Sequence, residues 1–379
     1  MSDKHTILYL ITSTNVGGAE KALFELIQRL DKTAFRVHVC SIKKPGGFAA
    51  RIESVADGFY CLGLGESGGI MAALNFFPAL IRLIRLVRRV RPVILHSFLF
   101  RANILGRIAG ALGKVPVRIS SIRVIEHNEP FKHIIERLTA PLVHKYIAVS
   151  EAVRRFTIAT SHVSPEKIVT IYNGIAGTGG RKTHSADTGP VAIDPRCSAI
   201  GLVGRFHAQK GHTVFVAALK IAVAREPRIK AYLFGEGPEE GAVRHMVSDE
   251  GLSDHVVFMK TVENITHYIA RLDIIVLPSL WEGFPNVLLE AMSEARPVVV
   301  SALAGMDEIV ADNETGILFQ PGDAAALADA IVMLIRDKQR GRAMGAAGQL
   351  RARTMFSIEN TVNQTVAVYK NLLAHNAGI

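Results

Sequence analysis

Short apolar runs alternate with helical patterns along the first 170 residues, and this alternation constrains the fold more than any other feature of the sequence. The runs that predict β-strands span 6–13, 36–41, 93–97, 117–121 and 146–149. Between the first two runs, residues 19–30 repeat their apolar side chains at helical spacing. Strands that alternate with helices form β-α units with a parallel sheet, so the sequence predicts an α/β fold.

A polar stretch between residues 173 and 197 interrupts this pattern. It is rich in Gly, Ser, Thr, Asp and Pro, which is typical of a domain boundary. The alternation then resumes, with strands expected at 199–203, 230–234, 256–259 and 273–277 and helices at 211–224 and 239–248. We therefore expect two Rossmann-like β/α/β domains, residues 1–180 and 181–356, that face an interdomain cleft. A helix over 357–379 is expected to pack back on the first domain.

The positive charge of the chain is concentrated in its first half. The 379 residues are enough for two domains, and the net charge is +10. Residues 1–200 hold 27 Lys and Arg against 14 Asp and Glu, whereas residues 201–379 hold 17 against 20. A one-sided positive field attracts nucleic acid, an anionic membrane surface or a phosphorylated small molecule, and the charge alone does not choose among them.

Cysteine usage and hydropathy indicate a cytoplasmic protein. Cys40, Cys61 and Cys197 are too widely spaced for a disulfide framework or a CxxC metal site. The apolar run near the N-terminus has only seven residues and ends in a polar glycine turn, so it predicts a strand and not a signal peptide. No stretch approaches the roughly 18–20 apolar residues of a membrane-spanning helix. We expect a soluble protein or one peripheral to the inner face of the plasma membrane.

Two glutamates separated by seven residues lie in the most specific stretch, residues 278–299. Glu282 is expected in the turn after a strand, and Glu290 about one turn into a helix that starts near Pro285, a residue suited to the first helical position. The backbone N–H groups of 286–288 would then form an anion site for a diphosphate, with a carboxylate on each side for sugar hydroxyls. Alternatively, Glu282 caps the helix and Glu290 lies on a solvated face.

Two cations follow the strand at 199–203. Arg205 and Lys210 lie in its loop, where Gly204 and Gly211 allow close backbone approach. The carboxyl end of a parallel sheet is where such folds bind ligands, so the pair suits phosphate recognition, although ordinary surface charges give the same pattern. A glycine-rich turn containing Gly235 follows the next strand.

The segments GRFHAQKG, LFGEGPE, LDIIVLPS and EGFPNVLLEAM, in this order and spacing, resemble the retaining glycosyltransferases of family 4, the group 1 glycosyltransferases, which have the GT-B fold. The resemblance spans about residues 199–325, and GGAE near the N-terminus extends it to the first domain. It implies that Arg205 and Lys210 hold the donor's diphosphate, that Glu290 binds the ribose and that Glu282 contacts the transferred hexose. The donor-binding residues implied in full are Gly17, Gly18, Arg205, Lys210, Gly235, Thr261, Val262, Glu282, Gly283, Phe284, Pro285, Asn286, Val287 and Glu290.

Two histidines at expected strand ends, His96 and His127, could contact the hexose or move a proton. The resemblance favours His127, because it follows the strand whose loop faces the donor in related enzymes. The expected catalytic residues are therefore Glu282, His127, Arg205 and Lys210. The resemblance implies no enzymic nucleophile: the leaving phosphate helps to deprotonate the acceptor, and the cations stabilise the charge that grows on the diphosphate. The chain has no Asp-x-Asp motif, so we expect no metal and no cofactor.

Residues 76–92 predict a basic amphipathic helix with a wide apolar side and five arginines. This side could rest on an anionic membrane surface, where each nearby basic residue contributes about 1 kcal/mol. Equally, the helix could cover the sheet of the N-terminal domain and leave its arginines in solvent.

The sequence thus predicts a retaining, metal-independent hexosyltransferase. It would move a hexose from UDP- or GDP-hexose to a glycan or lipid-linked glycan, in bacterial cell-surface polysaccharide synthesis, with the acceptor on the N-terminal domain and the donor on the C-terminal one. A sugar-nucleotide 2-epimerase of the same fold is the alternative enzyme. A basic nucleic-acid-binding protein is more remote, because no helix-turn-helix, zinc finger or RNA-binding motif is present, and nucleic acid is not an expected partner.

Overall fold

The computed structural model describes residues 4–65, 69–125, 129–176, 193–262 and 264–376. The chain divides into two compact units. Unit 1 comprises Met1–Gly174 and Ile358–Ile379, and unit 2 comprises Ile175–Ser357. Each unit has its own sheet and its own apolar core.

Seven parallel strands form the sheet of unit 1, in the order β3-β2-β1-β4-β5-β6-β7. The strands are β1 (His5–Ile11), β2 (Phe35–Lys43), β3 (Gly58–Leu64), β4 (Ile94–Phe98), β5 (Val117–Ile122), β6 (Lys145–Ala148) and β7 (Ile168–Thr170). The central strand β1 buries a continuous run of apolar residues, as expected of a parallel sheet that is covered on both faces.

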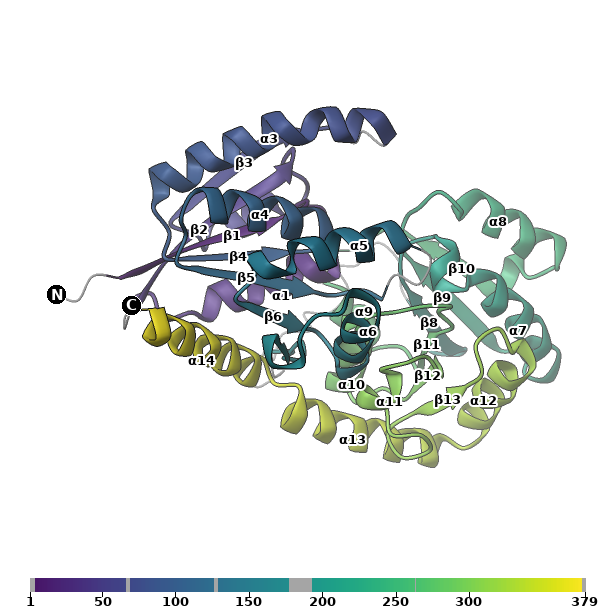
Figure 1. Ribbon diagram of the computed structural model, residues 1–379. Helices are drawn as coiled ribbons and strands as arrows, with labels where there is room; N and C mark the ends of the chain where they lie inside the picture. Colours follow the sequence, from purple (N-terminus) through teal and green to yellow (C-terminus); the bar gives the residue numbers. More distant parts are fainter. Residues whose placement is uncertain (1–3, 66–68, 126–128, 177–192, 263, 377–379) are drawn as a thin grey trace. The chain divides into compact units, whose positions relative to one another are not determined.

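Helices cover both faces of this sheet (Figure 1). They are α1 (Gly18–Arg29), α2 (Ala49–Glu53), α3 (Gly69–Val90), α4 (Phe100–Leu112), α5 (Pro130–Thr139), α6 (Glu151–Ser161) and α14 (Ile358–Asn376). Helices α3 and α4 pack against each other on one face, and α1 and α14 do so on the other.

Helix α3 contains the basic amphipathic segment, and its apolar side belongs to the core. Ala79, Leu83, Leu86 and Val87 are buried in the main hydrophobic cluster of unit 1, while the arginines of the helix are exposed. Most of this apolar side therefore covers the sheet, while Phe77 and Ile81 of the same helix stay 69% and 50% exposed. Among the described residues, every helix is too short or too polar to cross a bilayer.

A buried hydrogen-bond chain joins α14 to the sheet of unit 1. The Tyr369 hydroxyl lies 3.0 Å from the Tyr9 hydroxyl and 2.6 Å from Nδ1 of His96, whose Nε2 lies 2.8 Å from Oγ of Ser121. Burial lowers the pKa of His96 to about 3, so its ring is neutral at neutral pH. Because both ring nitrogens are engaged inside the core, the structure gives His96 a structural role and not contact with a ligand.

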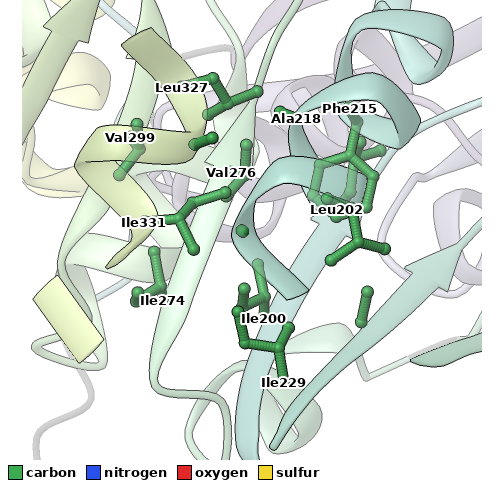
Figure 2. Close-up of a cluster of buried hydrophobic side chains, with 14 of the residues drawn as sticks. Ile200, Leu202, Phe215, Ala218, Ile229, Ile274, Val276, Val299, Leu327 and Ile331 are labelled. Atoms are coloured by element: carbon green, nitrogen blue, oxygen red, sulfur yellow. The ribbon is translucent and has the colours of Figure 1, made fainter. Parts of the chain in front are cut away.

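Unit 2 contains a six-stranded parallel sheet in the order β10-β9-β8-β11-β12-β13. The strands are β8 (Ser198–Val203), β9 (Ile229–Phe234), β10 (Val256–Met259), β11 (Ile274–Leu277), β12 (Val298–Ser301) and β13 (Ile317–Phe319). The helices are α7 (His212–Arg225), α8 (Glu240–Asp249), α9 (Ile265–Ile269), α10 (Asn286–Ser293), α11 (Met306–Ile309), α12 (Ala324–Arg336) and α13 (Lys338–Met355). Figure 2 shows the core, where Phe215 of α7 and Ile331 of α12 join apolar side chains of the central strands.

The order of strands reverses once in each sheet. In unit 1 the reversal lies between β1 and β4, and in unit 2 it lies between β8 and β11. Loops diverge at such a point, and open α/β sheets bind ligands there, outside the carboxyl ends of the strands. The two parallel sheets with covering helices confirm the predicted α/β class.

Candidate active site

The reversal point of unit 2 brings together the two charged residues that its motifs singled out. Lys210 follows β8 and Glu282 follows β11, and these strands are neighbours. The Lys210 ammonium lies 2.5 Å from Oε1 of Glu282. The two side chains are 18% and 7% exposed, so this ion pair is largely shielded from water. A cation and a carboxylate therefore share one position at the ligand-binding edge of the sheet.

Two further side chains hold Glu282 in place. Ser279 donates its hydroxyl proton to Oε1 of Glu282 at 2.8 Å. The Gln209 amide donates to the Trp281 carbonyl at 3.0 Å and lies 3.4 Å from Oε2 of Glu282. Gln209 and Ser279 lie within the sequence motifs but were not predicted as site residues, because only the folded loops reveal their contacts.

Gly211 allows the loops after β8 and β11 to touch. Its φ is +63°, a left-handed conformation, and a Cβ at this position would overlap the carbonyl oxygen of Pro278. The backbone N–H of Leu280 donates to the Gln209 carbonyl at 2.8 Å and joins the same two loops. The Lys210–Glu282 pair therefore depends on a close backbone contact that no larger residue permits.

The other residues of unit 2 that were predicted to bind the donor lie in the loops after β8, β9 and β10. Arg205 is exposed in the loop after β8, and within the described part of the chain no hydrogen bond or ion pair engages its guanidinium. Gly235, after β9, lies against the backbone of Gly204 and Arg205. Thr261 and Val262 follow β10. The structure thus places Arg205, Lys210, Gly235, Thr261, Val262 and Glu282 after four adjacent strands, at one edge of one sheet.

Helix α10 differs in detail from its prediction. It begins at Asn286, and Pro285 is the residue before it with an extended ψ of 109°, so Pro285 is not the first helical residue. The N–H of Leu288 donates to the Pro285 carbonyl at 3.1 Å and is not available to a ligand, which corrects the expectation for that group. Half-buried Glu290 lies in the second turn of α10.

The residues that precede α10 are buried. Gly283, Phe284 and Pro285 are all inaccessible, and Val287 is buried inside the helix. Phe284 packs against Phe356 with 5.8 Å between ring centroids. Packing against protein therefore accounts for the side chain of Phe284.

Gly17 and Gly18 lie in unit 1, at the start of α1. Gly17 precedes the helix in extended conformation, and a Cβ there would come within 2.5 Å of the Glu20 carboxylate. Glu20 accepts a hydrogen bond from Ser13 at 2.8 Å, and burial raises its pKa. The absence of a side chain at Gly17 thus accommodates Glu20. His127 lies outside the described residues.

No cluster of three or more His, Cys, Asp or Glu side chains suited to a metal ion occurs among the described residues. Lys210 and Arg205 are positive groups at the carboxyl edge of the sheet of unit 2. Cations on side chains can neutralise a diphosphate through charge-assisted hydrogen bonds. The chemistry that this edge can perform is recognition of an anion next to a hydrogen-bond-accepting carboxylate.

Comparisons with known proteins give the family. The model "Glycosyl transferases group 1" matches residues 197–337, and the model "Glycosyltransferase Family 4" matches residues 16–176. Capsular polysaccharide biosynthesis glycosyltransferase CapM of Staphylococcus aureus is 25% identical over 81% of this chain and 84% of its own length. Lipopolysaccharide core biosynthesis mannosyltransferase LpsB of Rhizobium meliloti (strain 1021) is 32% identical over 48% of this chain and 54% of its own length.

The fold has a close counterpart among solved structures. Anabaena Alr3699/HepE in complex with UDP-glucose superposes with a TM-score of 0.80 at 20% identity, covering 97% of this chain and 99% of its own. The two family models together span most of the chain and fall on both units. They confirm the resemblance that the motifs carry. The chain belongs to the group 1, family 4 glycosyltransferases and has their GT-B fold.

Proposed function

We propose that the chain transfers a hexose from a nucleotide-sugar to a glycan or lipid-linked glycan, with retention of configuration and without a metal ion. Unit 2 binds the donor and unit 1 binds the acceptor. The observation that carries the proposal is the shielded Lys210–Glu282 pair at the reversal point of unit 2. HepE, which has the same fold, holds UDP-glucose, and this supports a UDP-hexose as the donor. GDP-hexose remains the second donor class.

Lys210 and Glu282 divide the work of donor recognition. The ammonium of Lys210 has three donor hydrogens, and the pair with Glu282 uses one of them, so the others can bind phosphate oxygens. Exposed Arg205 adds a second cation to the diphosphate. The carboxylate of Glu282 accepts a hydrogen bond from a hexose hydroxyl, while Ser279 and Gln209 keep it from turning away.

Transfer then needs no nucleophile from the protein. The acceptor hydroxyl oxygen bonds to the anomeric carbon as the bond from that carbon to the diphosphate breaks, on the same face of the sugar. The hydroxyl proton passes to the leaving diphosphate oxygen, so the products are a glycoside and a nucleoside diphosphate. Lys210 and Arg205 stabilise the charge that grows on this oxygen, a preorganised electrostatic contribution.

The remaining donor-site residues complete the proposal. Glu290 binds the ribose, and Thr261 and Val262 lie beside the nucleotide base. The backbone of residues 283–287 faces the phosphates and the sugar. By the resemblance to the family, Gly17, Gly18 and His127 are further candidates for contact with the hexose. The names of CapM and LpsB refer to capsular polysaccharide and lipopolysaccharide core synthesis, which supports cell-surface polysaccharide synthesis at the inner face of the plasma membrane as the process.

A transfer assay with purified chain, radiolabelled UDP-glucose or GDP-mannose, and a bacterial glycolipid extract tests the proposal. Glu290→Ala is expected to abolish transfer, whereas Glu314→Ala, which removes an exposed carboxylate of the same unit, is expected to retain it. The anomeric proton of the product should show the configuration of the donor. Full activity of Glu290→Ala, an inverted product, or release of an epimerised nucleotide-sugar without acceptor would each contradict the proposal.

A further inference from the structure

A cavity of about 870 Å³ opens at the reversal point of unit 1. Thr12, Leu99 and Arg123 line it from the ends of β1, β4 and β5, and helices α4, α5 and α6 supply the rest of its wall. This is the place in unit 1 that corresponds to the Lys210–Glu282 position in unit 2. The topology therefore provides a second ligand position, which the donor chemistry of unit 2 does not use.

The wall of this cavity holds three cations, Arg101, Arg123 and Lys132, and two carboxylates, Glu129 and Glu136. Its carboxylate Glu136 forms a buried ion pair with Arg107, and its carboxylate Glu129 lies 3.4 Å from the Lys132 ammonium. Arg101 and Arg123 remain. Two cations of the wall that its own carboxylates do not pair suit a phosphate-bearing ligand.

Arg101 and Arg123 differ in their surroundings. Arg101 is exposed at the start of α4, and no hydrogen bond or ion pair engages it within the described ranges. Arg123 donates to the side-chain carbonyl of Asn173 and faces the carboxyl of Glu20. Burial lowers the pKa of Arg123 only to about 10, so it is charged at neutral pH. Both groups can therefore donate charged hydrogen bonds to an anion.

Helix α5 presents an apolar stripe to solvent beside this cavity. Phe131, Ile134 and Leu138 are 69%, 56% and 73% exposed, and their spacing of three and four residues places them on one side of the helix. The opposite side of α5 packs against α4 and α6, and Figure 1 shows α5 next to α4. Phe131 belongs both to the stripe and to the cavity wall, so the apolar surface is continuous with the cationic cavity.

We propose that unit 1 binds a phosphate-bearing lipid, whose phosphate enters the cavity at Arg101 and Arg123 and whose hydrocarbon lies on the apolar stripe of α5. The charge complementarity of the cavity and the adjoining stripe match the two parts of such an amphiphile. The inference rests on the proposed function and narrows its acceptor from a glycan or lipid-linked glycan to a lipid-linked one. It places the lipid-binding surface on α5, whereas most of the apolar side of α3 lies in the core.

Co-sedimentation of the full chain with vesicles tests the stripe. Vesicles of phosphatidylcholine with about 30% phosphatidylglycerol should bind the chain, and pure phosphatidylcholine vesicles should bind it far less. The triple variant Phe131→Ser, Ile134→Ser, Leu138→Ser should bind at least about tenfold more weakly, because three apolar side chains no longer leave water. Leu112→Ser and Leu350→Ser alter side chains that are 57% and 65% exposed elsewhere, and should bind as wild type does.

The cationic cavity is tested in the same assay. Arg101→Gln should weaken vesicle binding by several fold. Arg88→Gln removes an equal charge from an exposed position on α3 and should leave vesicle binding unchanged. Inorganic phosphate in the millimolar range should compete only partly, because it lacks the hydrocarbon. Complete displacement by phosphate would show that free phosphate and not a lipid is the ligand.

Three other results would also overturn the inference: wild-type affinity of the triple variant, equal binding to neutral and anionic vesicles, or equal losses in Arg101→Gln and Arg88→Gln. Calorimetric titration of the wild-type chain with UDP-glucose and with GDP-mannose, in the absence of vesicles, reports separately on the proposed function. Vesicle binding without nucleotide-sugar binding would refute the donor assignment, and nucleotide-sugar binding without vesicle binding would refute the lipid-binding assignment alone.

Discussion

Substitution of Gly211 by alanine tests how the donor site of unit 2 is built. Gly211 has φ +63°, and an alanine in this left-handed conformation costs about 1–2 kcal/mol of folding free energy. Its Cβ would also overlap the Pro278 carbonyl oxygen, so the loops after β8 and β11 must move apart. Forcing extra atoms into a packed position costs a further 1–3 kcal/mol or so. We expect Gly211→Ala to lose about 2–5 kcal/mol in total.

Gly251 provides a matched control for this substitution. Its φ is +67°, but nothing lies within 4 Å of a Cβ added there, so Gly251→Ala should lose only the backbone cost. Urea unfolding followed by the fluorescence of Trp281, the single tryptophan, measures both variants. Because the carbonyl of Trp281 accepts a hydrogen bond from Gln209, its native emission should change in Gly211→Ala and not in Gly251→Ala. Equal losses of stability and unchanged emission in both variants would refute the role given to the Gly211–Pro278 contact.

Three further predictions concern unit 1 and the chemistry. Tyr369→Phe leaves His96 and the Tyr9 hydroxyl without their shared partner and should cost about 1–3 kcal/mol in urea unfolding, so wild-type stability would contradict the hydrogen-bond chain. His96 has a pKa of about 3 in the folded chain, below its unfolded value near 6.5, so unfolding takes up a proton between these two pH values. The free energy of unfolding should therefore fall as the pH drops below about 6.5, by up to about 1.4 kcal/mol per pH unit from this group. A flat profile of unfolding free energy between pH 7 and 5 would contradict the lowered pKa of His96. Addition of EDTA should leave the rate of hexose transfer unchanged. If EDTA abolished transfer and a divalent metal restored it, the cationic side chains of unit 2 would not be enough to neutralise the diphosphate.

Most interior strands of both sheets were predicted from the sequence, because they are continuous apolar runs, but the interior strand β12 was missed. The predicted 199–203 and 230–234 each begin one residue later than β8 and β9, and the predicted 93–97 differs from β4 by one residue, whereas the predicted 256–259 coincides with the edge strand β10. Strand β3 was missed because it is a half-exposed edge strand with two glycines, and β7 and β13 were missed because they are edge strands of three residues. Short edge strands have neither the length nor the burial that produces a periodic pattern.

The candidate site was predictable in its residues but not in its contacts. The motifs identified Lys210 and Glu282 separately, one for the diphosphate and the other for the hexose. Their ion pair joins residues 72 positions apart, and it follows from the pairing of β8 with β11, which the sequence does not reveal. The stripe on α5 escaped prediction for a similar reason, since only the packing of the opposite side against α4 and α6 shows which apolar residues stay exposed.

Calorimetric titration with UDP-glucose and GDP-mannose tests most directly the claim that the reversal point of unit 2 binds a nucleotide-sugar. The wild-type chain should bind one of the two donors, and Lys210→Ala should bind it on the order of tenfold to a hundredfold more weakly, because a charged hydrogen bond to phosphate contributes about 1.5–3 kcal/mol. Lys220→Ala, which removes a 61% exposed lysine from the same unit, should retain wild-type affinity. Equal affinity of Lys210→Ala and wild type, or no binding of either donor by the wild-type chain, would contradict the account.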